Sequence, residues 1–366
     1  MGKYRTTQLL SAKDVGAAAT EVIDINVRDV ISRINIYWQT KIVTVSVELK
    51  PLTECIKRVE LVDGSDVLMS LTGEQIFALN YYDAGVISDY EASLTVNDFT
   101  KLGLHLDFGR WLWDTKYALD PKKYSNLQLK IEHSEALANT SVVINELIVE
   151  ADVFDEKQVS PSGFLMAKEI VTYTPASSTS NFLDLPTDWP IRKMIIQNET
   201  TDKNPFEQLD NIKLSEDNDK KVVIDMDGEE FFRTWRHKWP RQAYKMILDA
   251  VVTAKTVYNA FTYDVDIAIN YDGTAFVTAQ SKFAVATVTN AKIALTASVD
   301  IAAKTARITG LLPLSCMCWP FGDQDDDADW YDVTRIGSLQ LIHKSGSSVG
   351  TTPEGKIVLQ QARLYR

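Results

Sequence analysis

Cysteine and histidine are both scarce in this sequence. Three cysteines and four histidines occur among 366 residues. Three thiols cannot form a disulfide framework, so we expect synthesis in a reducing intracellular compartment. Cys316 and Cys318 flank a single methionine, and no second pair of thiols or nearby histidine completes a tetrahedral zinc site. We therefore expect Cys55, Cys316 and Cys318 to be small buried hydrophobic residues.

Positive charge and long apolar runs are also missing. The chain has 38 lysines and arginines against 50 aspartates and glutamates, a net charge of −12. Because phosphate contacts need clustered basic residues, we expect no specific nucleic-acid partner. No stretch approaches the ~20 uninterrupted apolar residues of a membrane-spanning helix. Residues 1–20 lack the apolar core of a signal peptide, so we do not expect export by the usual route.

Fingerprints of common enzyme classes are missing as well. The sequence contains no Gly-x-Ser-x-Gly element, P-loop or dinucleotide-binding fingerprint. We therefore assign no catalytic, cofactor-binding or metal-binding residue and expect no cofactor. A pair of carboxylates that flanks a sugar cannot be recognised among so many acidic residues, so a glycosidase function remains an open alternative.

What the sequence does contain is an internal repeat. Five short blocks recur in the same order, which favours a duplicated β unit. The recurring blocks are residues 31–36 and 191–196, 59–61 and 212–214, 71–77 and 226–232, 108–109 and 321–322, and 125–129 and 337–341. The offset between the copies is 191 − 31 = 160, then 228 − 73 = 155, and then 339 − 127 = 212, so the second copy carries extra residues, at about 240–310.

Strand patterns dominate both copies. Apolar and polar residues alternate or β-branched residues cluster in many short stretches, as expected for half-buried strands. These stretches are 42–49, 126–131, 141–149, 265–271, 281–288, 292–299 and 305–311. Asp272-Gly273 follows one of them and predicts a hairpin, because glycine accepts the positive φ of a type I′ turn.

Helices are predicted to be few and short. Thr72 and Gln75 have the spacing of a capping box, and Asp227 takes the same place in the second copy. A longer helix is predicted over 241–256, where residues 244, 247, 248 and 251 form one apolar stripe.

Turn-rich segments divide the chain. Residues 159–163 and 174–180 are rich in serine, threonine, proline and glycine and have no hydrophobic period. We predict an N-terminal arm at 1–19, a first domain at 20–157, a linker at 158–181 and a second domain at 182–366. The insertion at about 240–310 belongs to the second domain.

Two groups of residues have the form of metal ligands. His105 and Asp107 form a His-x-Asp element, and His133 could complete the facial triad of a jelly-roll iron oxygenase. An ordinary strand-to-loop His and Asp is the favoured interpretation.

Alternating aspartates at 323, 325, 327 and 329 resemble half of a calcium loop. However, Ala328 stands where that loop needs glycine, and Thr334 where it needs a bidentate glutamate. We expect a solvated acidic loop, with an irregular cation site at a subunit contact as the alternative.

Eight tryptophans and fourteen tyrosines leave a carbohydrate-binding or glycan-cleaving β-sandwich protein as the alternative function. Trp113 and Trp330 recur at equivalent places in the two copies, and Trp235 lies on a predicted helix face. Repeated aromatics more often fill a core or a subunit interface than a sugar groove.

Each copy thus has a short capped helix, a Phe-Gly element, an aromatic-rich loop, a Leu-Gln-Leu strand and a closing strand. This arrangement resembles the double jelly-roll major capsid proteins of tailless icosahedral double-stranded DNA viruses, the lineage of the tectivirus-like phages and the adenovirus hexon. The resemblance covers the chain from about residue 20. It implies an all-β fold of two tandem eight-stranded jelly rolls with a few short helices.

The resemblance also implies a structural role without catalysis. Such proteins form homotrimers with a pseudo-hexagonal outline, which pack into an icosahedral shell and contact penton and minor capsid proteins. They are made in the host cytoplasm and end in the virion capsid, in many cases around an internal membrane. The N-terminal residues, with Lys3 and Arg5 before Leu9-Leu10, resemble the inward-facing arm of the family and could touch that membrane.

Overall fold

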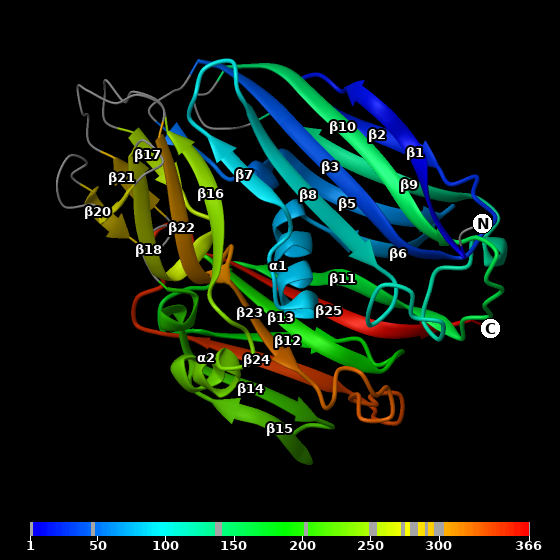
Figure 1. The fold of residues 1–366 in the computed structure, drawn as a ribbon. Helices are drawn as coiled ribbons and strands as arrows, with labels where there is room; N and C mark the ends of the chain where they lie inside the picture. The colour runs from blue at the N-terminus through cyan, green and yellow to red at the C-terminus, as the bar shows by residue number, and fades with distance from the viewer. Residues whose placement is uncertain are drawn as a thin grey trace.

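A computed structural model describes residues 3–44, 48–135, 141–200, 204–248, 255–271, 275–278, 285–289, 292–295 and 304–365. The described chain consists mainly of β-strands, with two α-helices (Figure 1). Two similar sets of strands account for most of it. The all-β class expected from the alternation is confirmed.

The first roll is made of two sheets. Four strands of the first sheet lie in the order β1 (Tyr4–Asp14), β10 (Ser141–Phe154), β3 (Ile31–Thr44) and β8 (Phe99–Asp107). The second sheet has the order β2 (Ala18–Asp24), β9 (Leu127–Ser134), β5 (Ile56–Asp63) and β6 (Asp66–Leu71).

The second roll repeats this topology. One sheet has the order β11 (Gly163–Tyr173), β25 (Glu354–Leu364), β13 (Ile191–Glu199) and β23 (Cys316–Pro320). The other has the order β12 (Ser180–Leu185), β24 (Leu339–Ser345), β14 (Leu209–Glu216) and β15 (Lys221–Met226). Each strand occupies the position of its counterpart in the first roll. The repeated sequence blocks fall on counterpart strands, helices and loops, so the predicted double jelly roll is confirmed.

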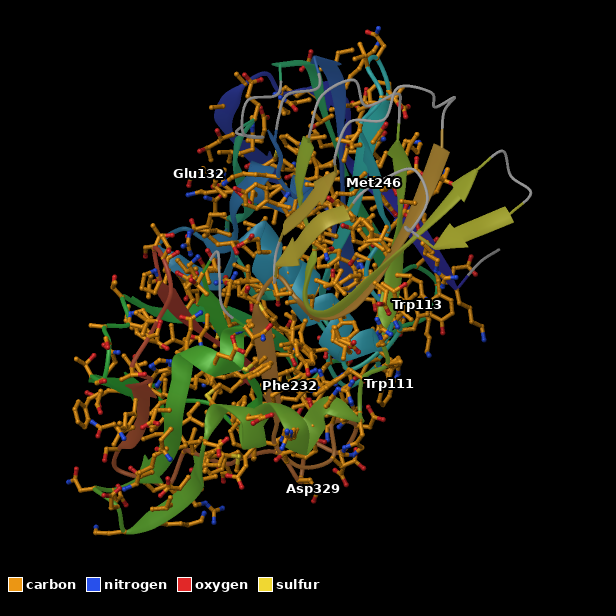
Figure 2. All side chains as sticks on the ribbon, turned by 90° about the vertical axis from the view of Figure 1, so that its left-hand side faces the viewer. Trp111, Trp113, Glu132, Phe232, Met246 and Asp329 are labelled. Atoms are coloured by element: carbon orange, nitrogen blue, oxygen red, sulfur yellow. The ribbon has the colours of Figure 1, made fainter. Side chains whose placement is uncertain are left out.

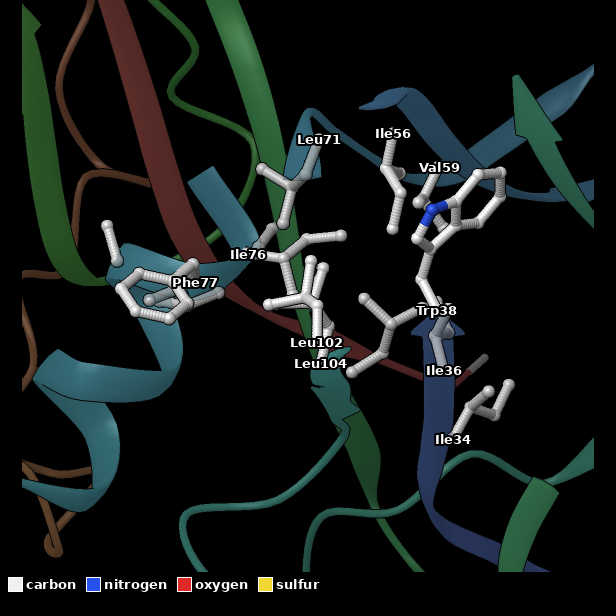
Figure 3. Packing of buried hydrophobic residues seen from close by; sticks show 14 of the residues in the cluster. Ile34, Ile36, Trp38, Ile56, Val59, Leu71, Ile76, Phe77, Leu102 and Leu104 are labelled. Atoms are coloured by element: carbon white, nitrogen blue, oxygen red, sulfur yellow. The ribbon is translucent and has the colours of Figure 1, made fainter. Parts of the chain in front are cut away.

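Alternation along the strands builds the two cores. Ile34, Ile36 and Trp38 of β3 are buried and face Val59 from the opposite sheet (Figure 3). The same inward spacing in β24 buries Leu339 and other residues at every second position. Period-two patterning therefore explains how each pair of sheets is held together.

The two helices begin in the same way. In α1 (Gly73–Ala84) the Thr72 side chain accepts from Gln75 N–H and the Gln75 side chain accepts from Thr72 N–H, which confirms the capping box. In α2 (Gly228–Arg236) the Asp227 carboxylate accepts from the backbone N–H of residue 230. At both first helical positions a Cβ would lie closer than 3.0 Å to a carbonyl oxygen of the preceding 3₁₀ turn, η1 (Leu52–Cys55) or η3 (Pro205–Gln208). The third such turn is η2 (Pro121–Lys123).

The extra strands of the second copy join the first roll. They are β16 (Gln242–Leu248), β17 (Lys255–Tyr258), β18 (Phe261–Tyr271), β19 (Ala275–Thr278), β20 (Val285–Thr289), β21 (Lys292–Leu295) and β22 (Lys304–Pro313). β16 pairs in parallel with β7 (Tyr90–Ser93), so the sheet of the first roll continues through β22, β18 and β19. β17 pairs with β4 (Glu48–Leu49). Figure 1 shows these strands gathered beside β7.

The two rolls also share a sheet. β6 of the first roll and β11 of the second meet in parallel at Ser70 and Lys168, which makes one eight-stranded sheet from two four-stranded ones.

One sequence prediction needs correction. The helix over 241–256 is wrong, because β16 covers its first part and pairs with β22 and β7. The segment 1–19, predicted as an arm, contains β1 as an edge strand on β10. The segment 158–181, predicted as a linker, contains β11. The division into an arm, two domains and a linker remains a prediction.

The hairpin at Asp272-Gly273 lies outside the described residues. Its flanking strands pair in antiparallel fashion, with Tyr271 opposite Ala275. The parts of the strands predicted at 281–288 and 292–299 that are described belong to β20 and β21.

Candidate functional site: the seam between the rolls and its outer loops

α1 links the two rolls. It contacts β8 of the first roll and β23 of the second, and Figure 1 shows it between the two sets of sheets. The Tyr82 hydroxyl donates to the Cys316 carbonyl at 2.6 Å, and Trp239 Nε1 donates to the Tyr82 carbonyl at 3.1 Å. We call this interface, formed by α1 on one side and β13, β23 and β25 on the other, the seam.

A buried charge cluster lies in the seam. Asp83, near the end of α1, faces Arg192 and Lys193 of β13, with N–O distances of 2.5 Å to each cation. The two cations are 2% and 1% exposed. Gln360 of β25 donates to the second carboxylate oxygen at 3.1 Å and accepts from Arg192 at 2.8 Å. One carboxylate of the first roll is therefore the shared anionic partner of two buried cations of the second.

The protonation of Asp83 follows from this geometry. Burial alone would raise the pKa of its carboxyl, but the charges of Lys193 and Arg192 outweigh burial and lower the pKa from 3.8 to about 2. The pKa of Lys193 is also lowered, because burial and the Arg192 charge outweigh the attraction of Asp83. The Asp83 carboxylate is thus held ionised, while the two adjacent cations repel each other.

A second polar cluster lies at the beginning of α1. Gln197 of β13 donates to Glu74 at 3.0 Å and to Glu199 at 2.6 Å, and Lys356 contacts Glu199 at 2.8 Å. Burial and the nearby carboxylates of Glu199 and Glu54 raise the pKa of Glu74. Glu74, Glu199 and Lys356 border a cleft of about 460 Å³ between the rolls.

Counterpart loops of the two rolls meet at the outer end of the seam. Lys116 Nζ lies 2.6 Å from Asp327, and the Tyr117 hydroxyl donates to the same carboxylate at 2.9 Å. The Tyr117 ring packs on Trp330 at 5.4 Å. Residues 323–329, which we call the acidic loop, are therefore anchored to the first roll through Asp327.

The structure does not bring the candidate iron ligands together. His105 and Asp107 lie on β8, 3.6 Å apart, and Arg33 contacts Asp107 at 2.5 Å. His133 is buried in the other sheet, on β9, with its ring 5.2 Å from Trp38. Among the described residues no group of three or more His, Cys, Asp or Glu side chains could hold a metal ion.

The other singled-out residues are mostly internal. The three cysteines are buried as predicted, and burial raises the pKa of the Cys55 and Cys318 thiols to about 12. Trp330 is buried, and Trp113 packs between Tyr4 and Phe154. No helix within the described ranges is long and apolar enough to cross a membrane.

The sequence predictions missed the charge cluster of the seam. Arg192 and Lys193 stand together inside a repeated block that is otherwise apolar, where the first copy has Ser32 and Arg33. Two adjacent cations in a central strand were a signal that these side chains need a buried partner. Their partner, Asp83, comes from the other roll and has no such signal.

No family model and no curated protein sequence matches the chain. Solved structures do match it over nearly its whole length. The MCP of STIV, Sulfolobus Turreted Icosahedral Virus, gives a TM-score of 0.62 at 11% identity over 100% of this chain and 97% of that one. The major capsid protein P2 of bacteriophage PM2 gives 0.54 at 12% over 98% of both chains.

VP54 of PBCV-1 gives a TM-score of 0.58 at 10% identity over 98% of this chain and 93% of that one. The identities are low, but the coverage includes both rolls of this chain. The chain therefore has the double jelly-roll fold of viral major capsid proteins.

Proposed function

We propose that this chain is a viral major capsid protein that assembles as pseudo-hexagonal homotrimers into an icosahedral shell. The observation that carries the proposal is the identical strand order of the two rolls. Two similar rolls give one chain two similar edges, and three chains then present six. A hexagonal lattice needs six nearly equivalent edges, so the duplication has a geometric use.

The seam supports a mechanical role. A shell protein must transmit load between its two rolls without letting them hinge. The shared sheet at Ser70 and Lys168, together with the buried cluster around Asp83, joins the rolls through the backbone and through side chains. The proposal includes no catalysis and no cofactor.

Further partners belong to the same proposal. Contacts with penton and minor capsid proteins, synthesis in a host cytoplasm and residence in the virion follow from the assembly role. A contact with an internal membrane near the N-terminus would use the exposed face of β1 rather than a free arm, because β1 is part of a sheet.

Sedimentation velocity tests the proposal. At micromolar concentration we expect one species of about 3 × 41.1 = 123 kDa. Negative-stain images should show particles with a six-sided outline. A monomer at that concentration, together with binding on a glycan array, would contradict the capsid role and favour the carbohydrate-binding alternative.

A further inference from the structure

The outer face of α2 carries a hollow lined by basic side chains. The hollow has a volume of about 480 Å³, and the described residues that line it are Arg233, Arg236, His237, Trp239, Arg241 and Leu311. The three arginines already have carboxylate neighbours: Glu229 beside Arg233, Asp264 beside both Arg236 and Arg241, and Asp266 beside Arg241. Because a guanidinium has five N–H donors, each arginine keeps donors for a further acceptor. We call this feature the arginine hollow.

An aromatic crevice adjoins the arginine hollow. Phe232 and Trp235 of α2 line it together with Tyr82 of α1, and it shares Arg236 and Trp239 with the hollow. Trp235 Nε1 is buried and has no hydrogen-bond partner among the described residues. The face thus offers an anion site beside an apolar slot with an unused donor. Figure 2 shows Phe232 on this side of the molecule.

The acidic loop at the other end of the second roll has the complementary chemistry. Asp323, Asp325, Asp326 and Asp329 are exposed, and unlike Asp327 they form no ion pair with a described residue. In a chain of net charge −12, a cluster of unpaired carboxylates needs a cationic partner to enter any contact.

An exposed aromatic residue stands beside the acidic loop. Arg110 donates to the Asp325 carbonyl at 2.5 Å and stacks on Trp111 at 4.3 Å. Trp111 is 48% exposed. The exposed Trp111 side chain therefore lies beside the carboxylates of the acidic loop. In the same way, the aromatic crevice lies beside the arginine hollow.

The two surfaces cannot meet within one chain. Figure 1 shows α2 at the left of the second roll and the orange loop after β23 at its right. Complementary patches at opposite ends of one chain produce head-to-tail contacts, which close into a ring when the rotation allows it. An anionic membrane or nucleic acid fits less well, because the whole chain is acidic.

We propose that the acidic loop of one copy docks into the arginine hollow of the next copy, with Trp111 packed over the mouth of the aromatic crevice, whose volume of about 20 Å³ is too small to admit the ring. The inference rests on the proposed trimer and names its contact. Each copy would then contact one neighbour through the acidic loop at one end of its second roll and the other neighbour through the arginine hollow at the opposite end.

Charge reversal tests the contact by sedimentation velocity of the full chain. The loop variant carries Asp325→Lys, Asp326→Lys and Asp329→Lys, and the hollow variant carries Arg233→Glu and Arg236→Glu. Each should weaken the trimer by about tenfold or more, because like charges then face each other. The variant that combines all five changes should recover most of that loss. Recovery excludes misfolding as the cause.

Two further variants sharpen the result. Trp111→Ala should weaken the trimer without changing its salt dependence, because it removes apolar area alone. The control carries Lys13→Glu and Lys344→Glu, whose side chains are 49% and 52% exposed and have one acidic partner each. This control should sediment as the wild type does.

If both charge-reversal variants form trimers as stable as those of the wild type, this contact is wrong and the proposed function remains intact. A wild-type monomer would overturn both. Vesicles of phosphatidylcholine and phosphatidylserine provide the other arm. If the wild type floats with them, and the hollow variant loses flotation but keeps its trimer, the hollow serves a lipid surface and the inference is wrong.

Discussion

Replacing Asp83 by asparagine removes the carboxylate that faces two buried cations across the seam. Its pKa falls from 3.8 in the unfolded chain to about 2 in the folded protein, which corresponds to about 2 kcal/mol of stability. Because the folded pKa is lowered, this contribution is complete above about pH 3.8 and is lost as the pH falls through about 2. Leaving the cations without their partner costs about 3–5 kcal/mol in buried pairs generally. We expect Asp83→Asn to lower the free energy of unfolding by about 2–5 kcal/mol at pH 7.

Urea unfolding at one fixed protein concentration, followed by tryptophan fluorescence, measures this cost. The matched control is Asp66→Asn, which breaks the contact of Asp66 with Arg363 at a site where Asp66 is 50% exposed. An exposed pair contributes less than about 1 kcal/mol. Adding Lys193→Met to Asp83→Asn should restore part of the loss, since one unpaired cation disappears. Equal costs for Asp83→Asn and Asp66→Asn would refute the reasoning.

Three other predictions concern single positions. Gly73→Ala should destabilise the protein by about 2 kcal/mol or more in urea, because its Cβ collides with the backbone of η1. His343→Phe should reduce the loss of melting temperature between pH 6.5 and 4: burial lowers the pKa of His343 to about 4, so the unfolded chain binds the proton first. Glu74→Gln should reduce the loss of melting temperature as the pH rises above 4.5, because the raised pKa of Glu74 makes its ionisation unfavourable in the folded state.

Each of the three has its own check. Gly346→Ala, whose Cβ would meet nothing closer than 3.5 Å, should be close to neutral; a cost equal to that of Gly73→Ala would count against the collision. An unchanged acid melting profile in His343→Phe would show that another group binds the proton. If the melting temperature of Glu74→Gln falls with rising pH as steeply as that of the wild type, Glu74 is not the cause of that fall.

Local signals in the sequence predicted local structure well. Thr72 and Gln75 formed the expected capping box, since that motif depends on a spacing of three residues and nothing else. The order of the repeated blocks predicted two similar β domains, and the resemblance to double jelly-roll capsid proteins predicted that each is a jelly roll.

The segment after α2 shows where such signals fail. Tyr244 and Ile247 have helical spacing, but Tyr244 and Met246 are also two apart and are both buried, with Lys245 exposed between them. A short apolar run fits either period. Pairing with β22 and β7 decides the outcome, and neither neighbour can be recognised from this stretch.

The candidate site was the least predictable part. Asp83 and Arg192 are 109 residues apart and come from different rolls. A buried ion pair between two domains leaves no periodic trace in either one. The acidic loop was predicted as a solvated surface, but its anchoring through Asp327 to Lys116 depends on how the rolls pack.

The parallel pairing of β7 with β16 also sets an order of events during synthesis. β7 ends at Ser93 and β16 begins at Gln242, so 242 − 93 = 149 residues separate the two partners. At about 5–20 residues per second, a ribosome needs roughly 7 to 30 s to supply the second strand. During that interval the first roll has an unpaired sheet edge, which is the kind of edge that recruits strands from other chains. A nascent chain therefore exposes this edge during the middle part of its translation, and the edge is covered once β16 has been made.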